Sequence, residues 1–204
     1  MAKLIEKCQS YNFEKLFKGK GYAYFKNGAY NLNIIGVRSN NKNKVTNLYD
    51  DVLVLIYNTP SGKTVRQVYT ITTEPGKYYM NKELGNKKGT AILVPGQYRG
   101  AWQIALHRGK YEALCQRKPV KVYRDSNKDL IYDMKPTTID NGIFGINIHR
   151  SNQTWTRQTV DQYSAGCQVF NNPLEFQAFI RFCKKQRDIY GNSFTYTLIN
   201  EEDM

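Results

Sequence analysis

The chain has 204 residues, and its 30 Lys and Arg against 17 Asp and Glu give a formal net charge of +13 at pH 7. This length suits one sizeable domain with or without an appendage. No apolar stretch approaches the roughly 20 residues that a membrane-spanning helix needs, and the N-terminus lacks the apolar centre of a signal peptide. We therefore expect no membrane span and no signal peptide. The chain is then cytoplasmic as synthesised, unless lysis machinery or a virion carries it to a cell wall.

The excess of positive charge indicates attraction to anionic partners, such as nucleic acid, anionic membranes or cell-wall polymers. Lys and Arg are spread along the sequence, so charge alone does not choose among these partners, and a nucleic-acid role rests on charge only. The four cysteines show no C-x-x-C spacing, which argues against a disulfide framework or a Cys-rich zinc site. They are Cys8, Cys115, Cys167 and Cys183.

The first half of the chain predicts one short helix followed mainly by strands. Residues 9–18 have a helical pattern that ends at Gly19 and Gly21. Residues 30–37 are typical of a strand. Two β-rich runs, 51–58 and 64–73, flank a Pro/Gly turn and predict a hairpin. Further strands are expected on both sides of Pro95-Gly96 and over 118–124.

The second half predicts one long helix over residues 173–190. Asn172 is a suitable N-cap, Pro173 suits the first helical position, and Gly191 is expected to end the helix. A last strand is expected over 193–199. The order of elements predicts a mainly β, α+β domain over residues 30–204, an antiparallel or mixed β sandwich-like fold with the long helix packed on it. Residues 1–29 are expected to form an N-terminal appendage.

The stretch from Gly142 to Asn171 carries the residues best suited to chemistry. A β-type run, 143–148, leads into His149; a polar loop, 150–163, then returns through Ser164-Ala165-Gly166-Cys167 to a second apolar run. This order predicts that His149 and Cys167 meet at the ends of neighbouring strands. A thiolate is a strong nucleophile, and a nearby imidazole can take the thiol proton. The backbone N–H groups of Gly166 and Cys167 are candidates for holding an oxyanion.

Other interpretations use the same residue types. A lone Cys or His more often has a structural role than a catalytic one. His107, the second histidine, could complete a zinc site with His149 and Cys167. A papain-like order, in which the His follows the Cys, survives only for Cys115 with His149.

A second motif has some of the spacing of a calcium loop. Asp125, Asn127, Asp129 and Asp133 supply oxygen ligands at suitable intervals, but no Gly follows Asp129 and no Glu stands at the twelfth position. We expect a polar β-turn and no metal.

The block formed by His149, the loop and Ser164-Ala165-Gly166-Cys167 resembles the signature of L,D-transpeptidase catalytic domains. Two departures are visible: Ala165 stands where that family usually has a second His, and Gln168-Val169 follow the Cys where an aliphatic residue and Arg or Asn are usual. The resemblance covers about thirty residues. It implies that Cys167 is the nucleophile, that His149 is its base, that Gly166 and Cys167 hold the oxyanion, and that no cofactor is needed. Supporting roles are expected for Ser164, Asn171, Arg150 and His107.

The function that this resemblance implies is cysteine-dependent acyl transfer or hydrolysis on peptidoglycan stem or cross-peptides. A phage-encoded lytic or virion-borne enzyme would account for the missing signal peptide. The alternative is a non-catalytic structural, virion or cell-wall-binding protein that keeps the fold, and the departures at Ala165 and Gln168 favour it. Expected partners are thus peptidoglycan peptides, another anionic wall polymer, or virion assembly proteins.

Overall fold

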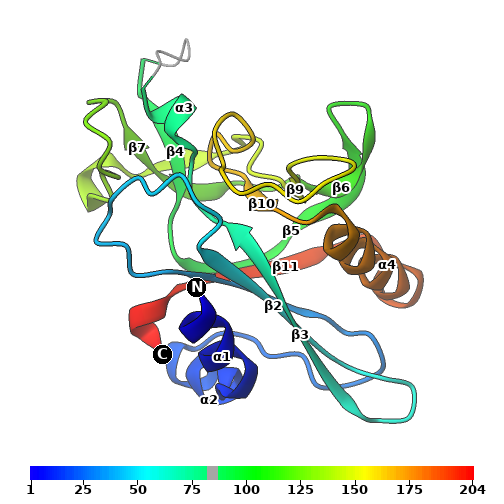
Figure 1. Ribbon diagram of the computed structural model, residues 1–204. Coiled ribbons are helices and arrows are strands. Elements are labelled where there is room, and N and C mark those ends of the chain that lie inside the picture. The colour runs from blue at the N-terminus through cyan, green and yellow to red at the C-terminus, as the bar shows by residue number, and fades with distance from the viewer. Residues whose placement is uncertain (82–86) are drawn as a thin grey trace.

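The computed structural model describes residues 1–81 and 87–204. Most of its regular structure is strand, and the elements follow one another along the chain as drawn in Figure 1. The helices are α1 (Ala2–Ser10), α2 (Phe13–Lys20), α3 (Lys77–Met80) and α4 (Pro173–Tyr190), with 3-10 turns at Pro136–Thr138 and Glu201–Asp203. The strands are β1 (Asn33–Arg38), β2 (Asp51–Asn58), β3 (Thr64–Thr72), β4 (Thr90–Leu93), β5 (Gly96–His107), β6 (Tyr111–Gln116), β7 (Val120–Asp125), β8 (Asp140–Gly142), β9 (Ile148–Arg150), β10 (Gln168–Phe170) and β11 (Phe194–Asn200).

The main sheet is a closed barrel, with the strand order β1-β11-β5-β6-β9-β10-β3-β2. It closes because β1 pairs with β11 in parallel on one side and with β2 in antiparallel on the other. The expectation of a sandwich-like arrangement is therefore wrong, although the mainly β class is confirmed. Period-2 patterns reveal which strands are half-buried, but they do not reveal that the first and last strands pair.

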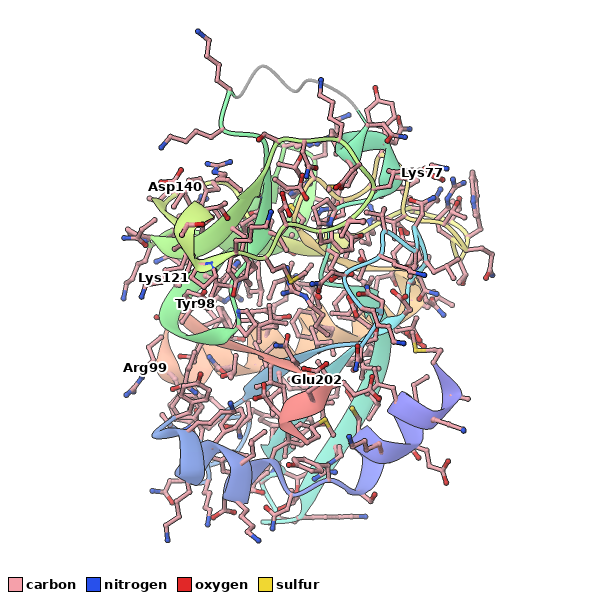
Figure 2. All side chains as sticks on the ribbon, turned by 90° about the vertical axis from the view of Figure 1, so that its left-hand side faces the viewer. Lys77, Tyr98, Arg99, Lys121, Asp140 and Glu202 are labelled. Atoms are coloured by element: carbon pink, nitrogen blue, oxygen red, sulfur yellow. The ribbon has the colours of Figure 1, made fainter. Side chains whose placement is uncertain are left out.

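The predicted hairpin is confirmed as β2 and β3, which pair from Asp51–Ile71 to Asn58–Thr64. Strands are also found on both sides of Pro95-Gly96, but they belong to different sheets. β4 joins β7 and β8 in a small three-stranded sheet, whereas β5 enters the barrel. The hydroxyl of Tyr98 on β5 links the two sheets by donating to the carbonyl oxygens of Val94 (2.6 Å) and Lys121 (3.2 Å); Tyr98 and Lys121 lie close together in Figure 2.

The prediction of α4 is confirmed at both ends. The side chain of Asn172 accepts hydrogen bonds from the N–H groups of Leu174 and Glu175, and the helix ends at Gly191. One face of α4 packs into the barrel core through apolar side chains, which are Phe176, Phe179, Ile180 and Cys183. The long helix is therefore packed on the sheet by its apolar face, as its sequence pattern predicts.

The N-terminal residues form two helices where one was expected over residues 9–18. Asn12 separates them, because its side chain caps α2 by accepting from the N–H of Lys15. Leu4 and Cys8 of α1 and Phe13 and Phe17 of α2 are buried in a second apolar cluster on the outside of β1 and β2. Both helices lie together against the barrel in Figure 1, next to the C-terminus. The division into residues 1–29 and 30–204 stays a prediction.

The run before His149 differs from its prediction. Residues 143–147 do not form a strand, and only Ile148–Arg150 pair as β9. Gly145 has a φ of +75°, which interrupts an extended conformation. The side-chain oxygen of Gln116 instead accepts the N–H groups of Phe144 (3.1 Å) and Ile146 (2.9 Å). The Gln116 side chain therefore provides the acceptor that a neighbouring strand would supply, and it fixes the backbone that leads to His149.

Candidate active site

Strand pairing places Cys167 and His149 on one face of the barrel wall. β9 and β10 are parallel, with His149 opposite Val169. Because side chains alternate along a strand, Cys167 projects on the same side as Val169, and therefore on the side of His149. Cys167 packs beside Val169 in one apolar cluster, which agrees with this placement. That the two side chains interact directly stays a prediction.

Gly166 is fixed by both backbone conformation and space. Its φ is +118°, in the region that favours glycine. A Cβ at this position would lie 2.2 Å from the carbonyl oxygen of Ala91 on β4. The turn before Cys167 therefore lies directly against the small sheet, and no larger residue fits without moving backbone.

Ser164 is fully buried and organises this turn. Its hydroxyl donates to the carbonyl oxygen of Cys167 (2.8 Å) and accepts the N–H of Gly166 (3.1 Å). In this conformation the Gly166 N–H is donated to Ser164, and its expected role in holding an oxyanion stays a prediction. Within residues 1–81 and 87–204, the N–H of Cys167 has no acceptor. Of the two N–H groups expected to hold an oxyanion, that of Cys167 is therefore the one available to bind it.

The thiol of Cys167 is half-buried and held between two backbone groups. Its Sγ donates to the carbonyl oxygen of Gly145 (3.3 Å) and accepts the N–H of Asn147 (3.5 Å). Burial raises the pKa of Cys167 to about 11, while the Asn147 N–H and the charge of Arg108 act in the opposite direction. The thiol is thus protonated at neutral pH, and a base is needed to make it a nucleophile.

His149 has the tautomer that such a base requires. Its Nδ1 lies 2.8 Å from the carbonyl oxygen of Arg150. Because a carbonyl oxygen only accepts, Nδ1 carries the proton, and Nε2 is left with a free lone pair. Burial, followed by the neighbouring His107, lowers the pKa of His149 to about 3, so the ring is neutral at pH 7. The hydroxyl of Tyr111 reaches the same carbonyl (3.2 Å) and supports this arrangement.

His107 is brought to the site from the end of β5. Its ring stacks on that of His149, with centroids 4.2 Å apart and planes at 21°. The side-chain oxygen of Asn147 accepts the N–H of Gln116 (2.9 Å), so its amide nitrogen donates to Nδ1 of His107 (3.1 Å). Asn147 therefore connects His107 to the thiol, since its backbone N–H reaches Cys167. Neither Asn147 nor Tyr111 was predicted from the sequence, although Asn147 precedes His149 by only two residues.

This stacking does not suit the zinc interpretation. The lone pairs of an imidazole lie in the ring plane, so two nearly parallel rings do not aim them at one ion. Within the described residues, no group of three His, Cys, Asp or Glu side chains is arranged to hold a metal ion.

The candidate calcium loop is a turn held by protein donors. The side-chain amide of Asn127 donates to carboxylate oxygens of Asp129 (3.1 Å) and Asp133 (3.0 Å). Asp125 accepts the N–H of Asp133 (2.8 Å). The oxygens that would face a cation instead accept N–H groups of the turn itself.

The remaining supporting residues have structural contacts. The carbonyl oxygen of Asn171 accepts the N–H of Arg157 (3.1 Å) and the hydroxyl of Ser151 (3.3 Å), which holds the start and the middle of the polar loop. The guanidinium of Arg150 lies over the ring of Tyr111, 4.3 Å from its centroid. Val160 and Tyr163 of the loop pack with Val169 beside Cys167. The loop therefore covers β10 itself.

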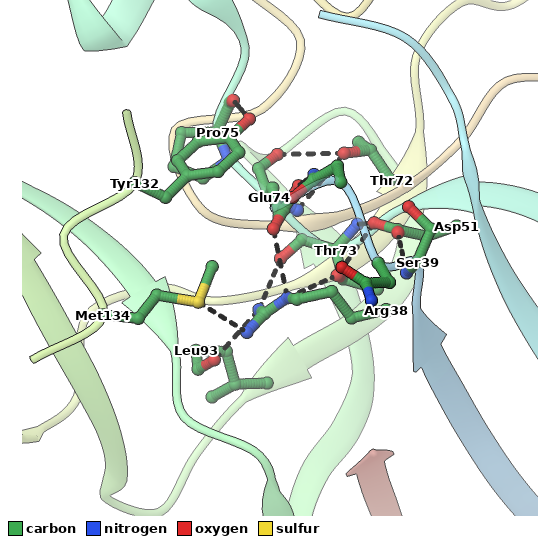
Figure 3. A network of polar contacts seen from close by, with 12 residues as sticks. Arg38, Ser39, Asp51, Thr72, Thr73, Glu74, Pro75, Leu93, Tyr132 and Met134 are labelled. Carbon is green, nitrogen blue, oxygen red and sulfur yellow. Dashed lines mark hydrogen bonds and ion pairs between the residues drawn. The ribbon is translucent and has the colours of Figure 1, made fainter. Parts of the chain in front are cut away.

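Gln168, which departs from the family pattern, belongs to a buried polar layer below the site. Its side chain donates to the carbonyl oxygens of Thr73 (3.4 Å) and Gly166 (3.3 Å) and accepts the hydroxyl of Tyr196 (2.8 Å). Thr73 also contacts Arg38, whose guanidinium lies among carbonyl oxygens and acidic groups in Figure 3. Gln168 thus connects the turn before Cys167 to this buried charge network.

Comparison with known proteins gives no relative on which to base a role: no family model, no curated protein and no solved structure matches the chain. Among the described helices, none has the length and apolar character needed to cross a membrane.

Proposed function

We propose that the chain is an L,D-transpeptidase-like cysteine enzyme that acts on peptidoglycan stem or cross-peptides. The observation that carries this proposal is the tautomer of His149: the Arg150 carbonyl holds the Nδ1 proton and leaves Nε2 with a lone pair, on a residue that pairs with β10 next to Cys167. A neutral imidazole with a bare nitrogen is the group that a protonated thiol needs. The sequence motif supplies the substrate class by resemblance.

In the proposed reaction, Nε2 of His149 takes the proton of the Cys167 thiol as sulfur attacks the carbonyl carbon of a peptide bond. The backbone N–H of Cys167 stabilises the oxyanion. The bond between the carbonyl carbon and nitrogen then breaks, and His149 passes its proton to the leaving amine. A second amine or a water molecule attacks the thioester, returns the proton through His149 and releases the thiol.

The test is mass spectrometry after incubation with a carbapenem, an acylating agent that mimics the acyl donor. A single adduct that maps to Cys167, and that disappears in Cys167→Ala, supports the enzyme. A folded protein that gains no adduct contradicts it.

The second candidate is a non-catalytic structural, virion or wall-binding protein that retains the fold. It is favoured by the hydrogen bond that occupies the Gly166 N–H and by the raised pKa of the Cys167 thiol, which burial causes. Absence of an adduct, together with retained binding to purified peptidoglycan sacculi, would support this candidate over the first.

A further inference from the structure

A groove of about 320 Å³ lies beside the imidazole pair, between one face of α4 and the ends of β6 and β9. Its apolar floor is formed by the buried side chains of Phe176 and Ile180. Tyr111 forms one wall, and its ring meets that of Phe176 edge-on at 6.2 Å. Figure 1 shows α4 alongside these strand ends.

Two guanidinium groups line this groove without an acidic partner among the described residues. Arg150 is held over the ring of Tyr111 by a cation–π contact. Arg181 is exposed on α4, and no carboxylate within residues 1–81 and 87–204 pairs with it. A guanidinium that lies flat on an aromatic ring keeps the N–H groups of its edge free to bind a carboxylate through two hydrogen bonds.

The charged side chains that line the groove limit the classes of ligand that can bind there. Lys184 is paired with Glu112 at 2.5 Å, so this part of the rim is neutralised and carries one carboxylate. Nucleic acid binds through many phosphate contacts spread along an extended basic surface. A short groove with two free guanidinium groups, a neutralised rim and an apolar floor instead suits a ligand that combines carboxylates with aliphatic groups.

We propose that this groove is a binding site for an acidic peptide, with a carboxylate held by Arg150 and Arg181 and an aliphatic side chain on Phe176 and Ile180. The proposal goes beyond the thiol chemistry, because none of its contacts involves Cys167. It is connected to the candidate active site through Tyr111, whose hydroxyl lies 3.4 Å from Nδ1 of His149.

The experiment uses isothermal titration of the full chain with a hexapeptide of alternating glutamate and leucine. A matched peptide with glutamine in place of glutamate isolates the contribution of the carboxylates. Replacing one of two charge-assisted contacts should weaken binding about tenfold, so we expect this loss in Arg150→Gln and in Arg181→Gln. Arg187→Gln is the control, because Arg187 lies on the same helix but pairs with Asp188 (2.9 Å) and does not line the groove.

Binding that is lost in the two groove variants and retained in Arg187→Gln supports the site. No measurable binding, equal weakening by Arg187→Gln, or equal affinity for the glutamine peptide overturns it. A single-stranded oligonucleotide that binds more tightly and is weakened by the same variants also overturns it, in favour of nucleic acid. The titration is repeated in Cys167→Ala, where peptide binding is expected to be unchanged; this separates the groove from the proposed chemistry.

Discussion

The rings of His107 and His149 stack at a centroid distance of 4.2 Å, although 41 residues separate them in sequence. Burial lowers the pKa of both, to about 4 for His107 and about 3 for His149. Two charged rings at this distance would repel each other, so the stacked pair is stable only while it is neutral. The carbonyl oxygen of Arg150 accepts the Nδ1 proton of His149, and the side-chain amide of Asn147 donates to Nδ1 of His107, so these two groups fix which nitrogens carry protons. The neutral form of His149, which is the form that can act as a base, is therefore favoured by the neighbouring His107 ring.

Replacing His107 by Ala should raise the pKa of His149, because the neighbouring ring is one of the causes that lower it. The sign for stability follows from linkage. With a folded pKa below the unfolded value of about 6.5, His149 binds more protons in the unfolded chain between these two values. Its contribution to stability is therefore complete above about pH 6.5 and is lost as the pH falls toward 3.

The measurements are an NMR titration of His149 and the free energy of unfolding at pH 7 and pH 5. His107→Ala should show a higher His149 pKa and a smaller loss of stability between these pH values. Tyr24→Phe changes a ring in the N-terminal apolar cluster, away from the ring pair, and is the control, with an unchanged titration. An unaltered His149 pKa in His107→Ala would contradict a coupled pair.

Cys167 should be the first of the four thiols to react with iodoacetamide. All four cysteines lie in the described part of the chain, and Cys167 is the half-buried one while the others are buried. Burial also raises the pKa of the other three, to about 12 for Cys8. Because burial raises the pKa of Cys167 to about 11, labelling should accelerate as the pH rises from 7 to 9.

The measurement is timed alkylation of the native protein followed by peptide mass spectrometry. In His149→Ala the rate at pH 7 should fall, because the thiol loses its base. Earlier labelling of Cys115 or Cys183 would count against the site.

Gly166→Ala should destabilise the protein by about 3 kcal/mol or more, because a Cβ 2.2 Å from the Ala91 carbonyl oxygen forces backbone to move and the φ of +118° adds strain. Gly109 provides a matched control. Its φ is +70°, but nothing lies within 4 Å of a Cβ built there, so Gly109→Ala should cost only about 1 kcal/mol. Chemical denaturation measures both. Equal losses of stability in the two variants would mean that the backbone of β4 moves away from the new Cβ at little cost.

The sequence predicts those parts of the fold that depend on local chemistry. Asn172 and Gly191 mark the ends of α4 because capping and left-handed conformations need particular residue types. Closure of the barrel depends on pairing of β1 with β11, from Ile34–Tyr196 to Arg38–Asn200, and no local pattern carries that information. The imidazole pair is similar, since it needs β5, β6 and β9 to be neighbours. The motif around Cys167 could be found in sequence, whereas its hydrogen bonds could not.

The buried charge network of Arg38, Asp51 and Glu74 should make a large contribution to the free energy of unfolding. Arg38, Asp51 and Glu74 are almost fully buried, and the Nε of Arg38 lies 3.4 Å from a carboxylate oxygen of Glu74 (Figure 3). Burial raises the pKa of both acids, and the charge of Arg38 acts in the opposite direction on each of them. Arg38→Met should cost about 3–5 kcal/mol, since it leaves buried carboxylates without a cation.

Adding Glu74→Gln to Arg38→Met should recover part of the lost free energy of unfolding, because it removes one of the buried carboxyl groups that no longer has a cation beside it. Denaturation of the two single variants and the double variant measures the coupling. Strictly additive losses would show that the two side chains contribute independently.

The last prediction concerns catalysis by Cys167. If the proposed function holds, Cys167→Ala should reduce turnover of wall peptides by about 10³-fold or more, as when a nucleophile is removed from a group that acts as a unit. His149→Ala should cost a comparable factor, because the thiol, which is protonated at pH 7 with a pKa that burial raises to about 11, loses the base that would take its proton. Cys115→Ala is the matched control, since this buried thiol donates to the carbonyl oxygen of Ala105 (3.6 Å) on the neighbouring strand. Its turnover should stay near that of the parent chain.

Turnover is measured by chromatography of muropeptides released from purified sacculi, with thermal melting to confirm that each variant is folded. Turnover that survives Cys167→Ala ends the mechanism in which Cys167 is the nucleophile.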